Sequence, residues 1–242
     1  MRIEGSVALV TGANRGIGKA IANELLERGA AKVYAAVRDV STVTDPRLVA
    51  VELDITNAEQ VAAVAEQLGD VDLVVNNAGI GRPGPPLSAT LDDARAELET
   101  NYLGLVSTTQ AFAPVLATNG GGAFVNVLSV VSWVGMPVLA TYSASKSAAW
   151  GYTNAARVQL GFQGTQVVGV HVGFVDTDLT AGFEIDKIAP EDVATSALDA
   201  LENGESEAVV DEFSRNVKAS LHDDQGLLYP GIAEQFAAAA AG

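Results

Sequence analysis

Short apolar runs alternate along this chain with stretches in which apolar residues recur every three or four positions. The runs predict strands and the periodic stretches predict helices. Because the runs are rich in Val, Ile and Leu, both faces of each strand should be buried. This alternation predicts an α/β fold, a single-domain Rossmann-type doubly wound parallel sheet with helices on both faces. The predicted strands cover residues 6–11, 32–37, 48–53, 71–76, 123–128 and 166–172, and the predicted helices cover 16–28, 56–68, 91–117, 142–160 and 190–201.

Local signals mark several element boundaries. Gly29 follows the first predicted helix, and Thr56-Asn-Ala-Glu59 has the spacing of a capping box at the start of the second. Pro190 suits the first turn of the last predicted helix. Neither a linker nor an internal repeat divides the chain, so we expect residues 1–242 to form one domain. The low-complexity tail at 237–242 is expected to fray.

Composition narrows the classes of partner. The 242 residues carry a formal net charge of −16, which disfavours nucleic acid and anionic membranes as partners because both need a positive surface. The chain has no Cys, which excludes disulfides, thiolate metal sites and thiol nucleophiles. Its apolar runs are all well short of the roughly 20 residues of a membrane span. We therefore expect a cytoplasmic protein, and we assign no metal site.

The charge is unevenly distributed along the chain. Residues 1–50 hold 7 basic and 5 acidic residues, whereas the remainder is strongly acidic. Residues 100–145 contain no Lys, Arg, Asp or Glu at all, although 18% of the chain is charged. A segment of this kind suggests burial from both sides, against the sheet, a ligand or a partner subunit.

A glycine cluster joins the first predicted strand to the first predicted helix. In Thr11-Gly-Ala-Asn-Arg-Gly-Ile-Gly18, the three glycines allow a tight turn, close approach of a pyrophosphate and close packing of helix on strand. The helix N-terminus would offer free N–H groups and a positive dipole to the phosphates. A simple tight turn is the alternative, and the strand–helix position favours the phosphate loop.

The second predicted strand bears on which dinucleotide is bound. NAD-binding proteins of this fold usually have an acidic residue at its end, where this chain has Val37 followed by Arg38. With Arg15 in the loop, two guanidinium groups suit the 2′-phosphate of NADP(H). Asp39 could instead pair with Arg38, or both arginines could simply be exposed. Asp54 could hydrogen-bond an adenine amino group or cap the end of the third strand.

Three further residues form a candidate catalytic group. Tyr142 and Lys146 lie four apart and share one face of a predicted helix. A nearby cation favours the phenolate, which would make a tyrosine useful as a proton donor or acceptor at neutral pH. Ser129 follows the strand at 123–128, at the carboxyl edge where open α/β sheets bind ligands.

These motifs together resemble the classical short-chain dehydrogenase/reductase (SDR) family over about residues 4–180. The resemblance rests on Thr11-Gly-x-x-x-Gly-x-Gly18, Asn76-Asn-Ala-Gly79, Asn101-x-x-Gly104, Ser129 and Tyr142-x-x-x-Lys146. It implies that Tyr142 is the general acid/base, that Ser129 orients the carbonyl, and that Lys146 binds the ribose and lowers the pKa of Tyr142. It implies that Asn101 supports a proton-relaying water. The cofactor-binding residues expected from the resemblance and the loop are Gly12, Asn14, Arg15, Gly16, Ile17, Gly18, Arg38, Asp54, Asn77, Ala78, Gly79, Tyr142, Lys146, Val175 and Thr177.

Two parts of the chain depart from the family pattern. Val172-Gly173 replaces the usual Pro-Gly, which could alter the stiffness of that loop. The usual C-terminal apolar strand is missing, so the seventh strand is expected to shrink to Ala208–Asp211, and the family's tetramer contacts are in doubt.

Residues 177–190 are expected to form a short substrate lid. Its apolar members could build a pocket with apolar residues elsewhere, or these residues could pack in the core. His171 lies within a predicted strand and is interpreted as structural. The candidate pocket residues are Leu179, Ala181, Phe183 and Ile185 with Trp133, Val134, Met136, Val138 and Phe174.

The sequence thus predicts an NADP(H)-dependent oxidoreductase, with NAD(H) possible, that moves a hydride between nicotinamide and a carbonyl or secondary alcohol. The substrate predicted from pocket composition is a small-to-medium apolar ketone or aldehyde. Alternatives are a non-catalytic dinucleotide-binding sensor, an epimerase or dehydratase of the extended family, and a scaffold protein. The charge-free segment further predicts a homodimer through the helices near 91–117 and 142–160, with a tetramer uncertain.

Overall fold

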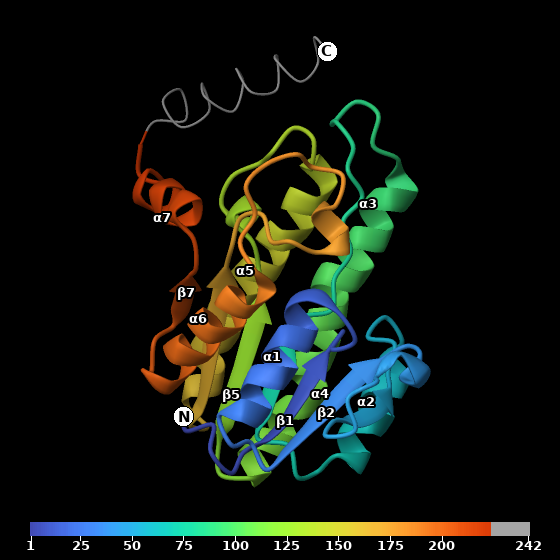
Figure 1. Cartoon of the computed structure of the whole chain (residues 1–242), viewed down its shortest axis with the longest axis vertical. Helices are drawn as coiled ribbons and strands as arrows, with labels where there is room; N and C mark the ends of the chain where they lie inside the picture. Colours follow the sequence, from blue (N-terminus) through green and yellow to red (C-terminus); the bar gives the residue numbers. More distant parts are fainter. Residues whose placement is uncertain (224–242) are drawn as a thin grey trace.

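The computed structural model describes residues 1–223 and shows seven parallel strands in one sheet, in the order β3-β2-β1-β4-β5-β6-β7 (Figure 1). The order reverses direction between β1 and β4, which places a topological switch point at their carboxyl ends. The predicted doubly wound parallel sheet is therefore confirmed. The strands are β1 Val7–Thr11, β2 Lys32–Val37, β3 Val49–Glu52, β4 Leu73–Asn76, β5 Gly122–Val127, β6 Thr165–His171 and β7 Glu207–Val209.

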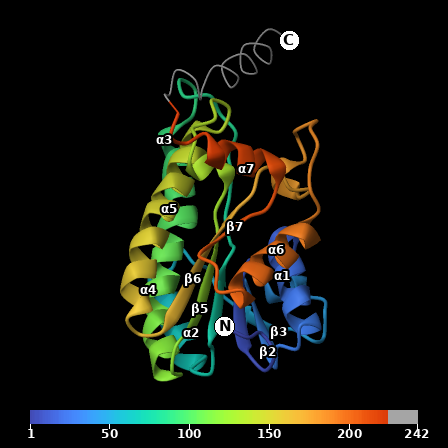
Figure 2. The same ribbon diagram turned by 90° about the vertical axis from the view of Figure 1, so that its left-hand side faces the viewer.

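Helices cover both faces of the sheet, as Figure 2 shows edge-on. Helices α1 and α6 pack on one face, and α2, α4 and α5 pack on the other. A hydrophobic core lies on each face of the sheet, and alternate residues of β1 pack into the two cores. Val10 packs on the α1 side and Leu9 on the α2 side. The main helices are α1 Gly16–Glu27, α2 Ala58–Gln67, α3 Leu91–Leu98, α4 Gly104–Thr118, α5 Ala140–Gly161, α6 Pro190–Glu202 and α7 Glu212–Ala219.

The chain is helical from Leu91 to Thr118, as predicted for 91–117, but the sequence did not predict the π-helical turn within this helix. A π-helical turn at Glu99–Leu103 separates α3 from α4. At Gly104 the helix lies very close to the loop that precedes α2. A Cβ added at Gly104 would be 2.7 Å from Ile55 Cδ1 in that loop. Apolar periodicity reports which face is buried but does not resolve one widened turn, and such turns occur frequently at functional sites.

The predicted capping box at Thr56 does not form. Asn57 caps α2, and its Oδ1 accepts a hydrogen bond of 3.1 Å from Gln60 N. The Thr56 hydroxyl instead donates to Asp54 Oδ1 at 2.7 Å. Thr56 and Asn57 are both residue types that can cap a helix. Because the Thr56 hydroxyl is hydrogen-bonded to Asp54, Asn57 becomes the cap.

The C-terminal region differs from the prediction in extent and content. The seventh strand is only Glu207–Val209, shorter than the predicted 208–211, and α7 follows it where no helix was predicted. Asp211 caps α7 by accepting from Ser214 N at 2.8 Å. The tail at 237–242 lies outside the described residues. Among the helices of residues 1–223, none is long and apolar enough to cross a membrane.

Candidate active site

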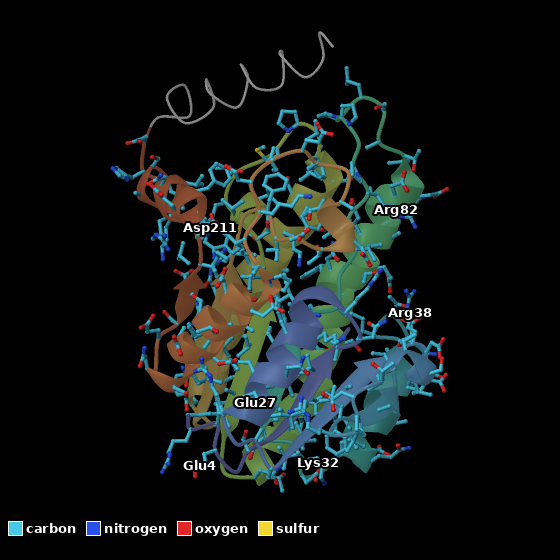
Figure 3. All side chains as sticks on the ribbon, viewed as in Figure 1. Glu4, Glu27, Lys32, Arg38, Arg82 and Asp211 are labelled. Carbon is cyan, nitrogen blue, oxygen red and sulfur yellow. The ribbon has the colours of Figure 1, made fainter. Side chains whose placement is uncertain are left out.

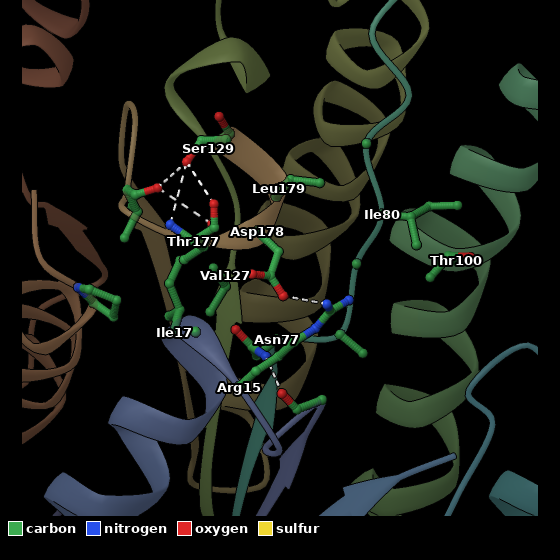
Figure 4. A pocket seen from close by; sticks show the side chains of 18 of the residues that line it. Arg15, Ile17, Asn77, Ile80, Thr100, Val127, Ser129, Thr177, Asp178 and Leu179 are labelled. Carbon is green, nitrogen blue, oxygen red and sulfur yellow. Dashed lines mark hydrogen bonds and ion pairs between the residues drawn. The ribbon is translucent and has the colours of Figure 1, made fainter. Parts of the chain in front are cut away.

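A cleft of about 1570 Å³ lies over the carboxyl ends of the strands, at the switch point between β1 and β4. Most of the residues predicted from sequence line it, including Tyr142 and Lys146. Figure 4 shows Ser129, Arg15 and Thr177 in this lining. Two predicted residues do not line it. Gly18 is buried beneath the loop, and Asn101 is buried behind the cleft wall.

The loop between β1 and α1 has the geometry of an anion-binding turn. Gly12 and Gly16 adopt φ values of 67° and 51°, which favour glycine. A Cβ at Gly18 would overlap Asn77 Nδ2 and Gly12 O. Within the described part of the chain, no side chain caps the N-terminus of α1 at Arg15. The first N–H groups of α1 therefore remain available to a phosphate.

The turn after β4 is tied to β1. The Thr11 hydroxyl accepts hydrogen bonds of 3.0 Å from both Asn77 N and Ala78 N, and it donates to Val75 O at 3.2 Å. Asn77 Nδ2 donates to Thr11 O at 2.8 Å. Asn77 thus fixes one wall of the cleft against the glycine loop.

The two predicted phosphate-binding arginines lie in different surroundings. Arg15 Nη1 is 2.5 Å from Asp178 Oδ2, so an exposed ion pair joins the glycine loop to the lid (Figure 4). Arg38 is exposed beside the cleft at the end of β2 (Figure 3). Asp39 does not pair with Arg38 but accepts from Ser41 N at 3.0 Å and caps a short turn. Arg38 is therefore free of the neighbour that could have neutralised it.

Asp54 caps the loop after β3 while also lining the cleft. Its Oδ1 accepts from Thr56 N at 2.9 Å and from the Thr56 hydroxyl at 2.7 Å. These hydrogen bonds lower the pKa of Asp54. The strand-end cap is therefore present, and a carboxylate that lines the cleft is still compatible with an adenine contact.

Ser129, Tyr142 and Lys146 come together from two elements. Ser129 follows β5, and its hydroxyl accepts from Val131 N at 3.3 Å and donates to Val172 O at 3.4 Å. Tyr142 and Lys146 lie one turn apart in α5. Lys146 Nζ is 5.8 Å from the centroid of the Tyr142 ring and donates to Val127 O at 2.9 Å.

Burial changes the acidity of both α5 residues. Burial raises the pKa of Tyr142, the negative charge of Glu97 raises it further, and a hydrogen bond with Ser129 lowers it. Burial lowers the pKa of Lys146 to about 8. The Lys146 ammonium group is directed to Val127 O, and its expected effect on the pKa of Tyr142 stays a prediction.

Asn101 occupies the π-helical turn and holds the loop after β4. Its Oδ1 accepts from Ile80 N and its Nδ2 donates to Ile80 O, each at 2.8 Å. Nδ2 also donates to the Ser145 hydroxyl at 3.0 Å. The Asn101 side chain, which was expected to support a water, therefore uses both Oδ1 and Nδ2 in hydrogen bonds within the protein.

His171 supports the main chain at Ser129. The fully buried ring stacks on Trp133 with centroids 3.9 Å apart, and Nδ1 lies 3.2 Å from Ser129 O. Nε2 lies 3.6 Å from Glu207 Oε1. Interaction with His171 and then Lys218 lowers the pKa of Glu207 to about 2. These contacts fit a structural role for His171.

The expected apolar pocket is only partly formed. Phe174, Leu179 and Phe183 line the main cleft, and Val138 lines a smaller adjoining cavity of about 380 Å³ together with Pro83 and Pro85. The remaining candidates line neither cavity. They are Trp133, Val134, Met136, Ala181 and Ile185.

One buried residue at this site was missed from the sequence. Glu97 in α3 has a fully buried side chain, and its Oε1 accepts from Arg82 N at 2.7 Å. The only signal in the sequence is its position four residues before Asn101. That spacing puts both side chains on one side of a helix.

Comparisons with known proteins bear on this geometry. The sequence model of the family described as short chain dehydrogenase matches residues 6–187. A 3-oxoacyl-acyl-carrier-protein reductase of Vibrio cholerae serotype O1 is 35% identical over 189 residues, covering 74% of this chain and 78% of the relative. A short chain dehydrogenase of Burkholderia cenocepacia J2315, solved in complex with NADP, is 42% identical with a TM-score of 0.92 and covers 96% of this chain and 99% of its own.

The match to the family extends from β1 to residue 187 in the lid, so it includes the glycine loop, Ser129, Tyr142 and Lys146. The same ordered residues meet at one cleft in the structure. The chain therefore belongs to the short-chain dehydrogenase/reductase family and is an oxidoreductase acting on CH–OH and C=O groups.

Proposed function

We propose that this protein is an NADP(H)-dependent reductase of small-to-medium apolar ketones or aldehydes. The observation that carries the proposal is the convergence of Ser129, Tyr142 and Lys146 on the cleft beside the glycine loop. Ser129 and Tyr142 hold the carbonyl oxygen, and Tyr142 gives it a proton. A tyrosine phenol has an ordinary pKa near 10, so it is protonated at neutral pH and can act as the donor.

The glycine loop fits a dinucleotide. Its positive-φ glycines and the uncapped N-terminus of α1, judged within residues 1–223, provide the free N–H groups that a pyrophosphate needs. Asp54 suits the adenine, Lys146 the ribose, and Val175 and Thr177 the nicotinamide end. When bound, the nicotinamide cofactor supplies hydride chemistry. Arg38, with Val37 before it, favours NADP(H), in keeping with the NADP-bound Burkholderia relative.

The apolar side of the cleft supports the substrate class. Phe174 and Phe183 pack with ring centroids 5.4 Å apart, so the lid presents an aromatic surface to the cleft. The cavity at Val138 and Pro83 extends this surface away from Tyr142. An apolar substituent of the carbonyl would gain burial here. The name of the Vibrio cholerae relative makes a 3-oxoacyl thioester the second candidate substrate.

A carbonyl panel tests the function. We expect NADPH absorbance to fall with acetophenone or ethyl acetoacetate, and to stay constant with fructose, because the aromatic pair of Phe174 and Phe183 favours an apolar substituent over a hydroxylated one. Acetoacetyl coenzyme A tests the thioester alternative. Tight NADPH binding without turnover of any carbonyl would instead indicate the sensor. A rate with fructose above that with acetophenone would contradict the substrate class.

We propose a homodimer in which α4 and α5 pack against a second copy. Both helices lie on the same face of the sheet, and α5 exposes Val158 by 69%, with Phe162 just after it exposed by 90%. Light scattering at micromolar concentration is expected to give the mass of a dimer, and Phe162→Asp is expected to lower it to that of a monomer. A monomeric wild-type protein would contradict the proposal.

A further inference from the structure

Glu97 is a buried acid with no assigned part in the reaction. Its side chain is 0% exposed, and Oε2 has no hydrogen-bond partner among the described residues. Burying a charged carboxylate with one oxygen unpartnered costs free energy. A leucine at this helix position would avoid that cost but would remove the acceptor of the Arg82 N–H group.

The carboxylate binds the loop that contacts Tyr142. Glu97 Oε1 accepts from Arg82 N at 2.7 Å, and Asn101, one turn later, holds both polar backbone atoms of Ile80 at 2.8 Å. Gly81 lies between these two anchors. A Cβ at Gly81 would be 3.4 Å from Tyr142 Cδ2, so the anchored loop passes close to the phenol ring and a side chain there would contact it.

We propose that Glu97 is a positioning residue of the active site that holds residues 80–82 against the Tyr142 ring and places a buried negative charge beside that phenol. The proposal rests on the proposed function, because it concerns how Tyr142 keeps the proton that it donates. An amide would satisfy Arg82 N equally well. What the carboxylate adds is its charge.

Among the charges near Tyr142, the Glu97 carboxylate is the one that disfavours ionisation of the phenol. The negative charge of Glu97 raises the pKa of Tyr142 in addition to burial. Lys146, on the same helix as Tyr142, carries the opposite charge but donates to Val127 O. Arg82 pairs with Asp93 at 2.5 Å at the surface. On the facing lid, Asp178 pairs with Arg15 at 2.5 Å, and Glu99 and Asp176 also line the cleft. Glu97 is therefore the acid that favours a protonated Tyr142.

The test titrates Tyr142 directly in the protein saturated with NADP⁺. Tyrosine labelled with ¹³C at Cζ gives a resonance that follows ionisation, and Tyr142→Phe assigns it. In Glu97→Gln we expect the midpoint to lie about one pH unit lower than in the wild type, because a buried like charge has been removed. The wild-type protein could unfold before Tyr142 ionises. In that case, a Tyr142 titration midpoint seen only in Glu97→Gln, within the pH range where the protein is folded, supports the proposal equally. Equal titration in the two proteins would overturn it.

Loop anchoring has its own readout. Hydrogen exchange of the Arg82 amide should stay slow in Glu97→Gln, which keeps an acceptor, and should accelerate in Glu97→Leu. Asp92→Asn is the matched control, because it removes an exposed charge from the same helix. It should alter neither measurement. If Glu97→Gln does not fold, Glu97→Asp retains the charge but shortens the reach, and it should keep the Tyr142 midpoint while accelerating exchange at Arg82. A lowered midpoint in that variant would overturn the proposal.

These measurements need no turnover, so they separate the two hypotheses. Failure of the wild-type protein to reduce any carbonyl with NADPH would overturn the proposed function while leaving the Glu97 titration result readable. With a reducible ketone such as ethyl acetoacetate, the alkaline decline of the rate should begin about one pH unit lower in Glu97→Gln, because loss of the phenol proton ends proton donation.

Discussion

Tyr142→Phe is expected to lower ketone reduction by about 10²- to 10⁴-fold, the usual contribution of a positioned general acid. The substitution removes only the phenolic oxygen. The ring remains to pack against Gly81, whose added Cβ would lie 3.4 Å from Tyr142 Cδ2. Because the glycine loop and Arg38 are untouched, the affinity for NADPH should stay within about twofold, a difference well below 1 kcal/mol.

The measurement pairs turnover with binding in the same preparation. Steady-state NADPH oxidation gives the rate, and nicotinamide fluorescence gives the dissociation constant. Tyr152→Phe is the matched control. Tyr152 lies on the same helix, and its ring contacts Tyr102 edge-on with centroids 6.4 Å apart, away from the cleft. It should turn over normally. If Tyr142→Phe also did so, another group would have to supply the proton.

Much of this fold could be predicted because the sheet is buried on both faces. Each central strand is then a continuous apolar run, as in Ala8–Val10, and the helices between the strands show regular periodicity. The glycine loop was equally predictable, because tight turns restrict the residue type. The site followed from ordered motifs, since parallel strands bring their carboxyl ends to the same edge.

Other features depend on contacts that local pattern does not encode. The widened turn at 99–103 arises where α4 meets Ile55, a residue nearly fifty positions earlier. Glu97 reads as an ordinary polar residue of an exposed helix until Arg82 N is placed beside it. The pairing of Arg15 with Asp178 joins segments that are adjacent only once the lid folds over the glycine loop.

The two arginines should differ in their contribution to NADPH binding. Arg15 already pairs with Asp178, and both side chains are largely exposed, at 70% and 74%. An exposed pair of this kind is worth about 0.2–1 kcal/mol, which binding of a phosphate would have to replace. Arg38 forms no such ion pair with Asp39, which caps the turn at Ser41, although, in addition to the Thr56 hydrogen bonds, the Arg38 charge lowers the pKa of Asp54. Loss of Arg38 should therefore weaken NADPH binding more than loss of Arg15.

Arg38→Ala is expected to weaken NADPH binding by about 10- to 100-fold, the range for a lost hydrogen bond to a charged group, and to leave NADH binding unchanged. Fluorescence titration with both cofactors measures the two effects separately. Arg47→Ala is the matched control, since Arg47 lies near β2 and β3 but pairs with Asp45 at 2.8 Å outside the cleft. A parallel loss of NADPH and NADH affinity in Arg38→Ala would mean that Arg38 supports the fold of the adenosine side. A selective loss would mean that the basic character of residues 1–50, in a chain of net charge −16, serves the 2′-phosphate.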